Sequence, residues 1–245
     1  MSLVQHASSL DPAENLAFLD TLDEVAAAGD LVVLPEASSR DFGQPGSDLR
    51  PYAEPLDGPY PQGLRKLAQD ALVIGGFFER TGNMPYNTLL ATGPGVEATY
   101  RKIHPYDSFG YRESDTVTPG PITPIAFGFD GARIGLMTCY DLRFPELARA
   151  LAADVIVVPA AWVAGPRKVA HWQTLVRARA IENVAFVLAV GQPGPRYTGH
   201  SMVVAPTGDV LVEAGEGEER IDATLDLGSI ADAREANPSL SNRRM

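Results

Sequence analysis

The sequence predicts an α/β fold in which helices cover two mixed β-sheets. Short apolar runs typical of buried strands alternate with segments of helical periodicity along the chain. The predicted strands also outnumber those that simple strand–helix–strand units need, which favours two mixed sheets over one parallel sheet. The 245 residues contain no linker that would divide them, so we expect a single domain over residues 1–245.

The amino-terminal segment predicts a strand, a helix and a second strand. Residues 1–5 leave room for only a very short strand, which we expect to be a weak edge strand. Asp11 is a suitable cap for a helix with proline in its first turn, and leucines at helical spacing extend this helix to Gly29. Residues 31–34 form an apolar run suited to a strand buried on both faces, and a proline ends it. Glu36 is therefore predicted just past the carboxyl end of a strand.

The next segment predicts one helix and three strands. The helix is expected near residues 62–70. Strands are expected at residues 71–79, 87–91 and 96–102, with Thr-Gly-Asn and Gly-Pro-Gly turns between them. Lys102 is then the last residue of the third strand. Residues 103–121 have no clear periodicity, so we expect a long loop there.

The second half of the chain continues this alternation. Asp130 and Gly131 are typical of a hairpin turn, and they join predicted strands at residues 125–129 and 132–138. Cys139 follows directly after the second of these strands. The remaining predicted elements are helices at residues 145–153 and 168–183, strands at residues 154–158, 185–190, 200–205, 210–213 and 220–225, and a short helix with a polar tail from residue 228.

Two of the predicted strands share a short repeated pattern. The segment DLVVLPEA begins at residue 30, and DVIVVPAA begins at residue 154. An alanine-rich helical segment precedes each of them. The chain therefore contains a weak internal repeat.

Composition argues against several classes of partner. A formal net charge of -11 and a sequence pI near 4.8 would repel phosphate backbones and anionic bilayers, so we expect no nucleic-acid partner. No apolar run reaches the roughly 18 residues that a membrane span needs, and the amino terminus lacks a basic segment followed by a hydrophobic one. We therefore expect a cytoplasmic protein that does not enter membranes.

The sequence also lacks the usual signs of metal and cofactor sites. A single cysteine cannot form an internal disulfide, and the 4 histidines are scattered without zinc-ligand spacing, so we expect no structural metal. The motifs GxSxG and GxGxxG and the phosphate loop do not occur. This absence argues against serine hydrolases, dinucleotide enzymes and nucleotide hydrolases, and we expect no cofactor.

Three polar residues occur at predicted strand ends, where layered α/β proteins build their sites. They are Glu36, Lys102 and Cys139. A cysteine at a strand-to-helix junction can have its thiolate favoured by backbone N–H groups and nearby cations. Each residue alone has an ordinary alternative: an inert buried thiol, a solvent-facing carboxylate or a surface charge.

The sequence segments around these residues distinguish the alternatives. The segments LPEAS, YRKIHPYDSFGYRES and GLMTCYDLRFPELARAL occur in this order, and together they resemble the nitrilase superfamily of carbon–nitrogen hydrolases. RARAIEN and GHSMVVAPTG extend the resemblance over nearly the whole chain. The resemblance implies a four-layer αββα sandwich that assembles at least into a homodimer.

The resemblance also implies roles for four residues. Glu36 matches the general base, Lys102 the cation that stabilises the oxyanion, and Cys139 the nucleophile that forms a thioester. Glu113, within FGYRES, matches a second glutamate that positions the lysine and the substrate. The backbone N–H of Tyr140 would assist Lys102 at the oxyanion. Two carboxylates beside one ammonium would also explain how a buried lysine stays charged.

The substrate is expected to be a small amide that yields an acid and ammonia. CYDLRFPEL and GPRKVAHW look most like the branch that contains omega-amidase and the deaminated-glutathione amidases. Arg143 is then a candidate for binding a substrate carboxylate, with an ion pair to Glu146 or Asp141 as the alternative. Trp162 is expected to line the substrate pocket, although an aromatic side chain there can also be simply core.

Two other functions remain open at this stage. One is a carbamoylase or an aliphatic amide or nitrile hydrolase of the same superfamily. The other, from a different class, is a non-catalytic scaffold that binds a partner.

Overall fold

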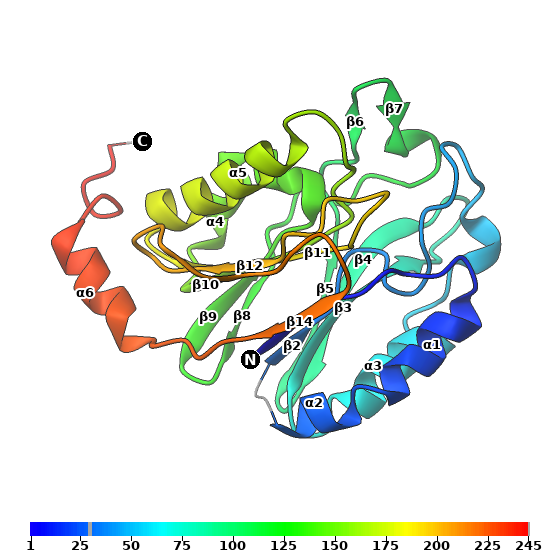
Figure 1. Ribbon diagram of the computed structural model, residues 1–245, viewed down its shortest axis with the longest axis horizontal. Helices are drawn as coiled ribbons and strands as arrows, with labels where there is room; N and C mark the ends of the chain where they lie inside the picture. The colour runs from blue at the N-terminus through cyan, green and yellow to red at the C-terminus, as the bar shows by residue number, and fades with distance from the viewer. Residues whose placement is uncertain (29–30, 245) are drawn as a thin grey trace.

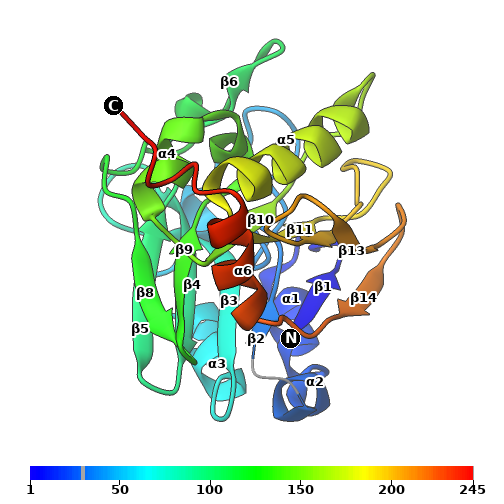
Figure 2. The ribbon, with the colours of Figure 1, turned by 90° about the vertical axis from the view of Figure 1, so that its left-hand side faces the viewer.

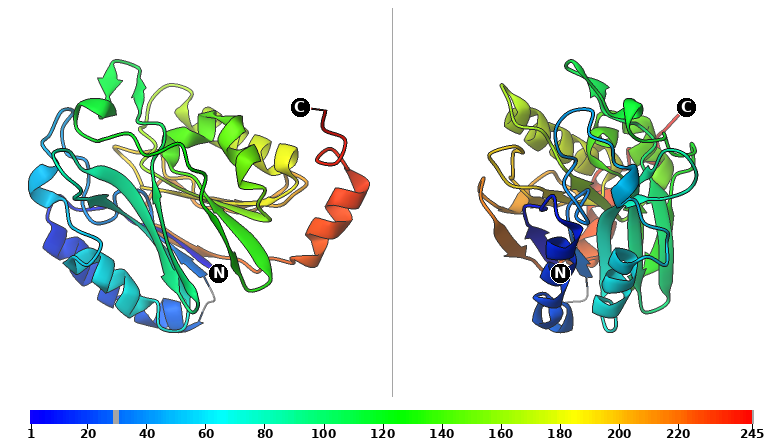
Figure 3. Two further views of the ribbon diagram at one scale, coloured as in Figure 1. Left: turned by 180° about the vertical axis from the view of Figure 1, so that it is seen from behind. Right: turned by 90° about the vertical axis from the view of Figure 1, so that its right-hand side faces the viewer.

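The protein is an αββα sandwich, in which two β-sheets pack face to face between layers of helices (Figure 1). The computed structural model describes residues 1–28 and 31–244. Figure 3 shows the same layers from behind, with the helices on the outer faces of both sheets. The predicted fold class is confirmed, including the two mixed sheets.

The first sheet combines parallel and antiparallel strands. β1 is parallel to β2 and β2 to β3, whereas β14, β4 and β5 join as antiparallel partners. The order of strands across this sheet is β14 (Glu219–Asp222), β1 (Ser2–Gln5), β2 (Leu31–Val33), β3 (Leu72–Glu79), β4 (Tyr86–Gly93) and β5 (Val96–Arg101).

The second sheet has the same pattern of directions. β9, β10 and β11 are parallel, and the strands outside them are antiparallel. The order across this sheet is β13 (Val210–Glu213), β12 (Met202–Val204), β11 (Phe186–Gly191), β10 (Val155–Ala160), β9 (Ala132–Leu136) and β8 (Ala126–Phe129). The repeated sequence pattern therefore falls on β2 and β10, which occupy equivalent places in the two sheets.

Helices cover the outer face of each sheet. The first sheet carries α1 (Pro12–Asp20), α2 (Asp23–Ala28) and α3 (Pro59–Leu67), and the second carries α4 (Pro145–Leu151) and α5 (Lys168–Asn183). α6 (Gly228–Ala236) follows β14 and projects from the sandwich at the left of Figure 1; in Figure 2 it faces the viewer. None of the helices that the structure describes is long and apolar enough to cross a bilayer.

β2 illustrates why a buried parallel strand can be one continuous apolar run. Leu31 and Val33 belong to the core between the sheets, whereas Val32 and Leu34 pack under the helices of the first sheet. A strand covered on both faces has no solvent-facing position, so its apolar run is continuous rather than alternating.

The predicted weak edge strand at residues 1–5 is wrong. β1 lies between β2 and β14, and all four of its residues are buried. β14 comes from the opposite end of the chain and pairs antiparallel with β1, from Ser2 opposite Asp222 to Gln5 opposite Glu219. The edge of the sheet is therefore β14. The prediction failed because this long-range pairing is invisible to local sequence patterns.

Two helix predictions need correction. The helix that begins after Asp11 is interrupted at Thr21, whose hydroxyl donates to the carbonyl of Phe18, and a separate helix follows. Its predicted end at Gly29 lies outside the described residues. The helix expected near residues 62–70 begins at Pro59, since proline fits the first turn, where no N–H partner is needed.

The predicted loop at residues 103–121 has more structure than expected. It contains a short hairpin, β6 (Asp107–Ser108) with β7 (Tyr111–Arg112), and the 3₁₀ turn η2 (Glu113–Asp115). The hairpin projects beyond the strand ends in two perpendicular views (Figures 1 and 2). It lies at the edge of the sandwich where the candidate residues meet.

Candidate active site

The ends of three strands bring the candidate residues together. Glu36 follows β2, Lys102 follows β5, and Cys139 begins the 3₁₀ turn η3 (Cys139–Arg143) after β9. All three side chains are buried. The first two come from one sheet and the third from the other, so the site forms where the two sheets meet.

Lys102 lies between two carboxylates. Its Nζ donates to Glu36 Oε1 at 2.8 Å and to Glu113 Oε2 at 2.7 Å. Burial lowers the pKa of Lys102, but the charges of Glu113 and Glu36 raise it by more, so this pKa lies well above its usual 10.5. The ammonium therefore stays protonated, as two adjacent carboxylates predict.

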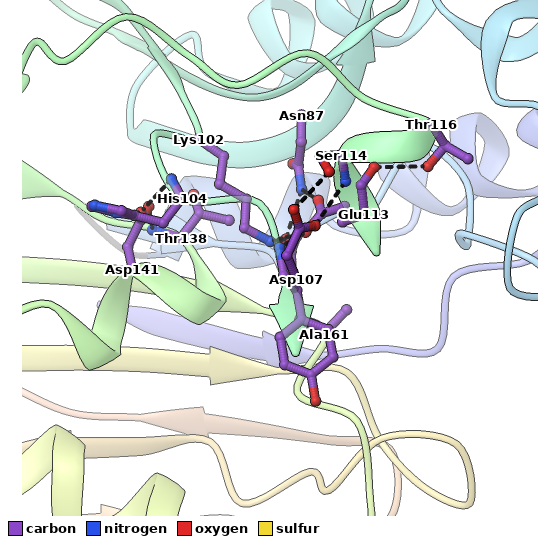
Figure 4. Close-up of polar contacts among 12 residues, drawn as sticks. Asn87, Lys102, His104, Asp107, Glu113, Ser114, Thr116, Thr138, Asp141 and Ala161 are labelled. Atoms are coloured by element: carbon purple, nitrogen blue, oxygen red, sulfur yellow. Dashed lines mark hydrogen bonds and ion pairs between the residues drawn. The ribbon is translucent and has the colours of Figure 1, made fainter. Parts of the chain in front are cut away.

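Asn87 is a site residue that the sequence analysis missed. Its Nδ2 donates to Glu36 Oε1 at 2.7 Å and to Glu113 Oε1 at 3.0 Å. Its backbone carbonyl accepts the backbone N–H of Lys102 at 2.8 Å. Figure 4 shows Asn87, Lys102 and Glu113 directed toward one point. The available signal was an asparagine at the start of a predicted strand, because a buried amide is tolerated only where it finds partners.

The second oxygen of Glu36 is held by the opposite sheet. The Ala161 N–H, just after β10, donates to Glu36 Oε2 at 2.7 Å. Gln192, just after β11, donates from Nε2 to the Glu36 carbonyl at 2.9 Å. Both oxygens of the carboxylate are thus engaged by named donors, which fixes its orientation.

Glu113 is fixed by the segment that precedes the hairpin. The Tyr106 N–H donates to Glu113 Oε2 at 2.6 Å, and the Glu113 N–H donates to the Tyr106 carbonyl at 3.1 Å. The buried carboxylate therefore reaches Lys102 from a 3₁₀ turn rather than from a long irregular loop. This contact gives the loop that follows Lys102 a defined conformation.

Cys139 carries a protonated thiol in the resting site. Burial raises its pKa, the charge of Glu36 raises it further, and Lys102 opposes them only in part, so the pKa lies well above 9.0. The prediction that N–H groups and a cation would favour the thiolate is therefore wrong. Burial and the charge of Glu36 together outweigh one ammonium here, and Glu36 hydrogen-bonds to the thiol that it would have to deprotonate.

Asp141 anchors the turn that presents Cys139. Its Oδ2 accepts the Tyr100 hydroxyl at 2.6 Å and the Thr138 N–H at 3.0 Å. Its Oδ1 accepts the His104 N–H at 3.1 Å and lies 2.7 Å from His104 Nδ1 (Figure 4). Cys139 itself has φ of +48°, a conformation that needs such support. This fully buried carboxylate therefore fixes the backbone at Cys139.

The predicted substrate-binding residues lie in a group of cations and rings beside Cys139. The members of this group are Tyr106, Phe109, Tyr140, Arg143, Trp162 and Lys168.

Arg143 does not form the predicted alternative ion pairs within the part of the chain that the structure describes. Asp141 is occupied by other donors, and Glu146 is exposed. The Arg143 guanidinium instead lies 4.9 Å from the Trp162 ring centroid, and its Nη2 lies 3.5 Å from His171 Nδ1. Arg143 therefore remains available for another anion.

Trp162 packs in the core, which was one of its two expected roles. Only 3% of it is exposed, its ring lies 5.5 Å from that of Trp172, and its Nε1 donates to the Lys168 carbonyl at 3.0 Å. The core packing holds the indole rigidly, while Arg143 lies over its face.

The arrangement supplies the parts of a nucleophilic acyl transfer. A thiol contacts a carboxylate able to take its proton, and an ammonium beside them can stabilise a developing oxyanion. Among residues 1–28 and 31–244, no group of three or more histidine, cysteine, aspartate or glutamate side chains is arranged to hold a metal ion.

Comparison with known proteins agrees with this chemistry. The family model described as carbon–nitrogen hydrolase matches residues 1–235. A protein of Mycobacterium tuberculosis named only as a hydrolase is 42% identical over 269 residues, covering 99% of this chain and 95% of that protein. The human deaminated glutathione amidase is 35% identical, covering 100% of this chain and 82% of its own. The zebrafish omega-amidase NIT2 is 34% identical, and the match covers 100% of this chain and 94% of that protein.

Solved structures share the fold. A carbon–nitrogen hydrolase superfamily protein of Xanthomonas campestris, with an arsenic adduct in its active site, has a TM-score of 0.90 and 32% identity, covering 100% of this chain and 96% of that chain. A mutant amidase of Nesterenkonia has a TM-score of 0.79 and 27% identity, and the match covers 99% of this chain and 92% of that chain. In that amidase, the active-site cysteine carries the acetamide moiety of fluoroacetamide.

Proposed function

Because the chain belongs to the carbon–nitrogen hydrolase family of the nitrilase superfamily, we propose that it hydrolyses small amides to a carboxylic acid and ammonia through a thioester on Cys139. One observation carries this proposal. The Cys139 thiol contacts Glu36, which shares Lys102 with Glu113 in a buried hydrogen-bonded set. The covalent acetamide on the cysteine of the related amidase supports the same nucleophile.

Acylation begins with the protonated thiol. Glu36 takes the thiol proton while sulfur attacks the amide carbon, so the thiolate forms only when a substrate is present to use it. The carbonyl oxygen becomes an oxyanion, which Lys102 and the Tyr140 N–H stabilise. Glu36 then gives the proton to the leaving nitrogen, ammonia departs, and the acyl group remains on sulfur as a thioester.

Deacylation repeats these roles with water. Glu36 takes a proton from water, hydroxide adds to the thioester carbon, and Lys102 again stabilises the oxyanion. The carbon–sulfur bond breaks, the acid leaves, and Glu36 returns the proton to sulfur. Glu113 positions Lys102 throughout, because its Oε2 accepts from Nζ at 2.7 Å.

We propose omega-amides of short dicarboxylic acids as the first substrates to test. The named relatives include an omega-amidase and deaminated glutathione amidases. Arg143 is the last residue of the turn that begins at Cys139, and it has no carboxylate partner among the described residues, so it can bind the free carboxylate of such a substrate.

The proposal is tested by measuring ammonia release from a panel of omega-amides, aliphatic amides, carbamoyl compounds and nitriles. We expect the wild-type protein to turn over at least one amide, and Cys139→Ser to be inactive toward all of them. Circular dichroism checks that the variant is folded. Turnover by the folded Cys139→Ser variant would refute the thioester mechanism.

We also propose that the chain forms at least a homodimer through α5 and β13. Ile181, Val210 and Leu211 are exposed apolar side chains on these elements, and Ile181 lies against the turn that precedes β13. An apolar group that spans two elements favours an interface. Light scattering should give at least a dimer for the wild type and a smaller mass for Ile181→Glu. The same change at Leu10, also exposed, serves as the control.

A further inference from the structure

Two cations outside the Glu36, Lys102 and Cys139 set face the same rings. The Arg143 guanidinium lies 4.9 Å from the Trp162 centroid, and Lys168 Nζ lies 5.6 Å from it. Phe109 of the β6–β7 hairpin also contacts both, at 5.9 Å from Arg143 and 4.2 Å from Lys168. One pair of rings therefore brackets two positive charges.

Neither cation has a carboxylate partner among residues 1–28 and 31–244. Lys168 Nζ donates to the Tyr106 hydroxyl at 2.8 Å, which is a neutral acceptor. Arg143 Nη2 lies 3.5 Å from His171 Nδ1, and Arg143 Nε is buried without a hydrogen-bond partner. Both side chains are thus partly desolvated without the compensating charge that such burial requires.

The two charges also disfavour each other. Burial lowers the pKa of Lys168, and the charge of Arg143 lowers it further. Lys168 is mostly buried at 8% exposure, so solvent screens this repulsion poorly. An arrangement that holds two like charges together without a counterion is poised to bind an anion.

The anion site lies beside the nucleophile. Lys168 Nζ donates to the Tyr106 hydroxyl, and the Tyr106 ring lies 5.1 Å from that of Tyr140, the residue that follows Cys139. Arg143 belongs to the same turn as Cys139. An anion bound by both cations would therefore be the other end of the molecule whose amide reaches Cys139.

We propose that Lys168 is a specificity-determining residue, which binds the substrate carboxylate jointly with Arg143 and so selects anionic omega-amides over neutral amides. This inference rests on the proposed amidase function. The rings of Tyr106, Phe109 and Trp162 lie against the cations and reduce their contact with water, which strengthens the charge–charge attraction. The same rings can contact the methylene carbons between the carboxylate and the amide.

A purely structural role for Lys168 makes a different prediction. Lys168 Nζ holds the Tyr106 hydroxyl, and the Tyr106 N–H donates to Glu113. If this connection were the whole function of Lys168, its loss would slow the hydrolysis of every amide equally. The backbone contact is unaffected by substitution, since Trp162 bonds to the Lys168 carbonyl.

The test compares succinamate, which is anionic, with butyramide, which is neutral and of similar length. In Lys168→Met, we expect kcat/KM for succinamate to fall roughly 10- to 100-fold, mainly through KM, because a hydrogen bond to a charged group is lost. For butyramide, kcat/KM should change less than about threefold. Lys168→Arg restores the charge and should recover most of the succinamate activity.

Lys66→Met is the matched control, because Lys66 is exposed and its ion pair with Asp20 lies on the far helices. It should change neither substrate's kcat/KM. Equal losses for succinamate and butyramide in Lys168→Met, or no loss for either, would overturn the inference.

A binding measurement separates this inference from the proposed function. Calorimetry with succinate, which contains no amide, needs no turnover. We expect Lys168→Met to bind succinate roughly 10-fold or more weakly than the wild type. If the two bind succinate equally, Lys168 is not a carboxylate-binding residue. A wild type that binds succinate but hydrolyses no amide would contradict the proposed function alone.

Discussion

The Ala161 backbone nitrogen lies 2.7 Å from Glu36 Oε2, so one sheet holds the carboxylate of the other. Ala161 follows β10 and Glu36 follows β2, the two strands that carry the repeated sequence pattern. The two halves of the repeat therefore have different tasks at one point. One half supplies the Glu36 carboxylate, and the other supplies the backbone donor that orients it.

Asn87 should be needed for turnover. Its amide donates to both Glu36 and Glu113, so Asn87→Ala leaves two adjacent carboxylates with Lys102 as their shared side-chain donor. We expect kcat to fall roughly 10- to 100-fold, the loss typical of a hydrogen bond to a charged group. Asn87→Asp should be worse, because it adds a third carboxylate. Asn237→Ala, at the end of α6, is the control, and an unchanged kcat in Asn87→Ala would contradict this role.

Gly76 should be essential for the geometry of Glu36. A Cβ at Gly76 would lie 2.6 Å from the Ala37 nitrogen and 3.0 Å from the Glu36 Cα, so Gly76→Ala must displace the backbone that carries the base. We expect a loss of about 1–3 kcal/mol in unfolding free energy and a kcat at least roughly tenfold lower. Urea denaturation and steady-state kinetics measure the two effects.

Gly128→Ala is the matched control for this change. A Cβ at Gly128, on β8, would meet nothing within 4 Å. Its unfolding free energy should stay within about 0.5 kcal/mol of the wild type. A Gly76→Ala variant as stable and active as Gly128→Ala would show that the backbone can move aside without consequence.

Asp141 should contribute to both stability and catalysis. In Asp141→Asn, the amide group turns donors toward the hydroxyl of Tyr100 or the nitrogens of His104, so buried donors lose their acceptor. We expect about 1–3 kcal/mol lower unfolding free energy and slower acylation, because Asp141 fixes the turn that begins at Cys139. Tyr100→Phe should give a smaller loss, and the two changes should be non-additive in a double-mutant cycle. Strict additivity would mean that the two residues act separately, against the contact described.

Alkaline pH should destabilise the wild type more than Cys139→Ser. Burial and the charge of Glu36 raise the pKa of Cys139 in the folded protein, whereas the unfolded thiol ionises near 9.0. Above that pH, the folded state binds more protons than the unfolded state, so stability falls as pH rises. The serine variant lacks this group, and the difference should approach about 1.4 kcal/mol per pH unit.

Urea unfolding between pH 7 and 10.5 measures this difference. The pH range ends at 10.5 because above it Lys102 would also make stability depend on pH. The ordinary pKa of lysine is 10.5, and the pKa of Lys102 is raised in the folded protein. Lys102 and the buried tyrosines are present in both proteins, so their contributions largely cancel. Parallel stability profiles for the two proteins above pH 9 would mean that the Cys139 thiol is not held protonated.

The sequence by itself determined the fold class and most of its elements. Continuous apolar runs placed β2 and β10, and helical periodicity placed α5 at residues 168–183, as observed. Local patterns work here because burial on both faces of a strand, or on one face of a helix, is written into adjacent residues. The same patterns put Glu36, Lys102 and Cys139 at or near strand ends.

Only the tertiary structure decided what those residues meet. β1 is interior because β14 pairs with it across the length of the chain, and Asn87 joins the site because β4 runs beside β3 and β5. The pKa of the Cys139 thiol is raised because burial between the sheets and the charge of Glu36, from a separate segment, outweigh the charge of Lys102. The physical reason is common to all three. Charge interactions and hydrogen bonds depend on the distance between groups in space, and these distances are set only when both sheets have packed.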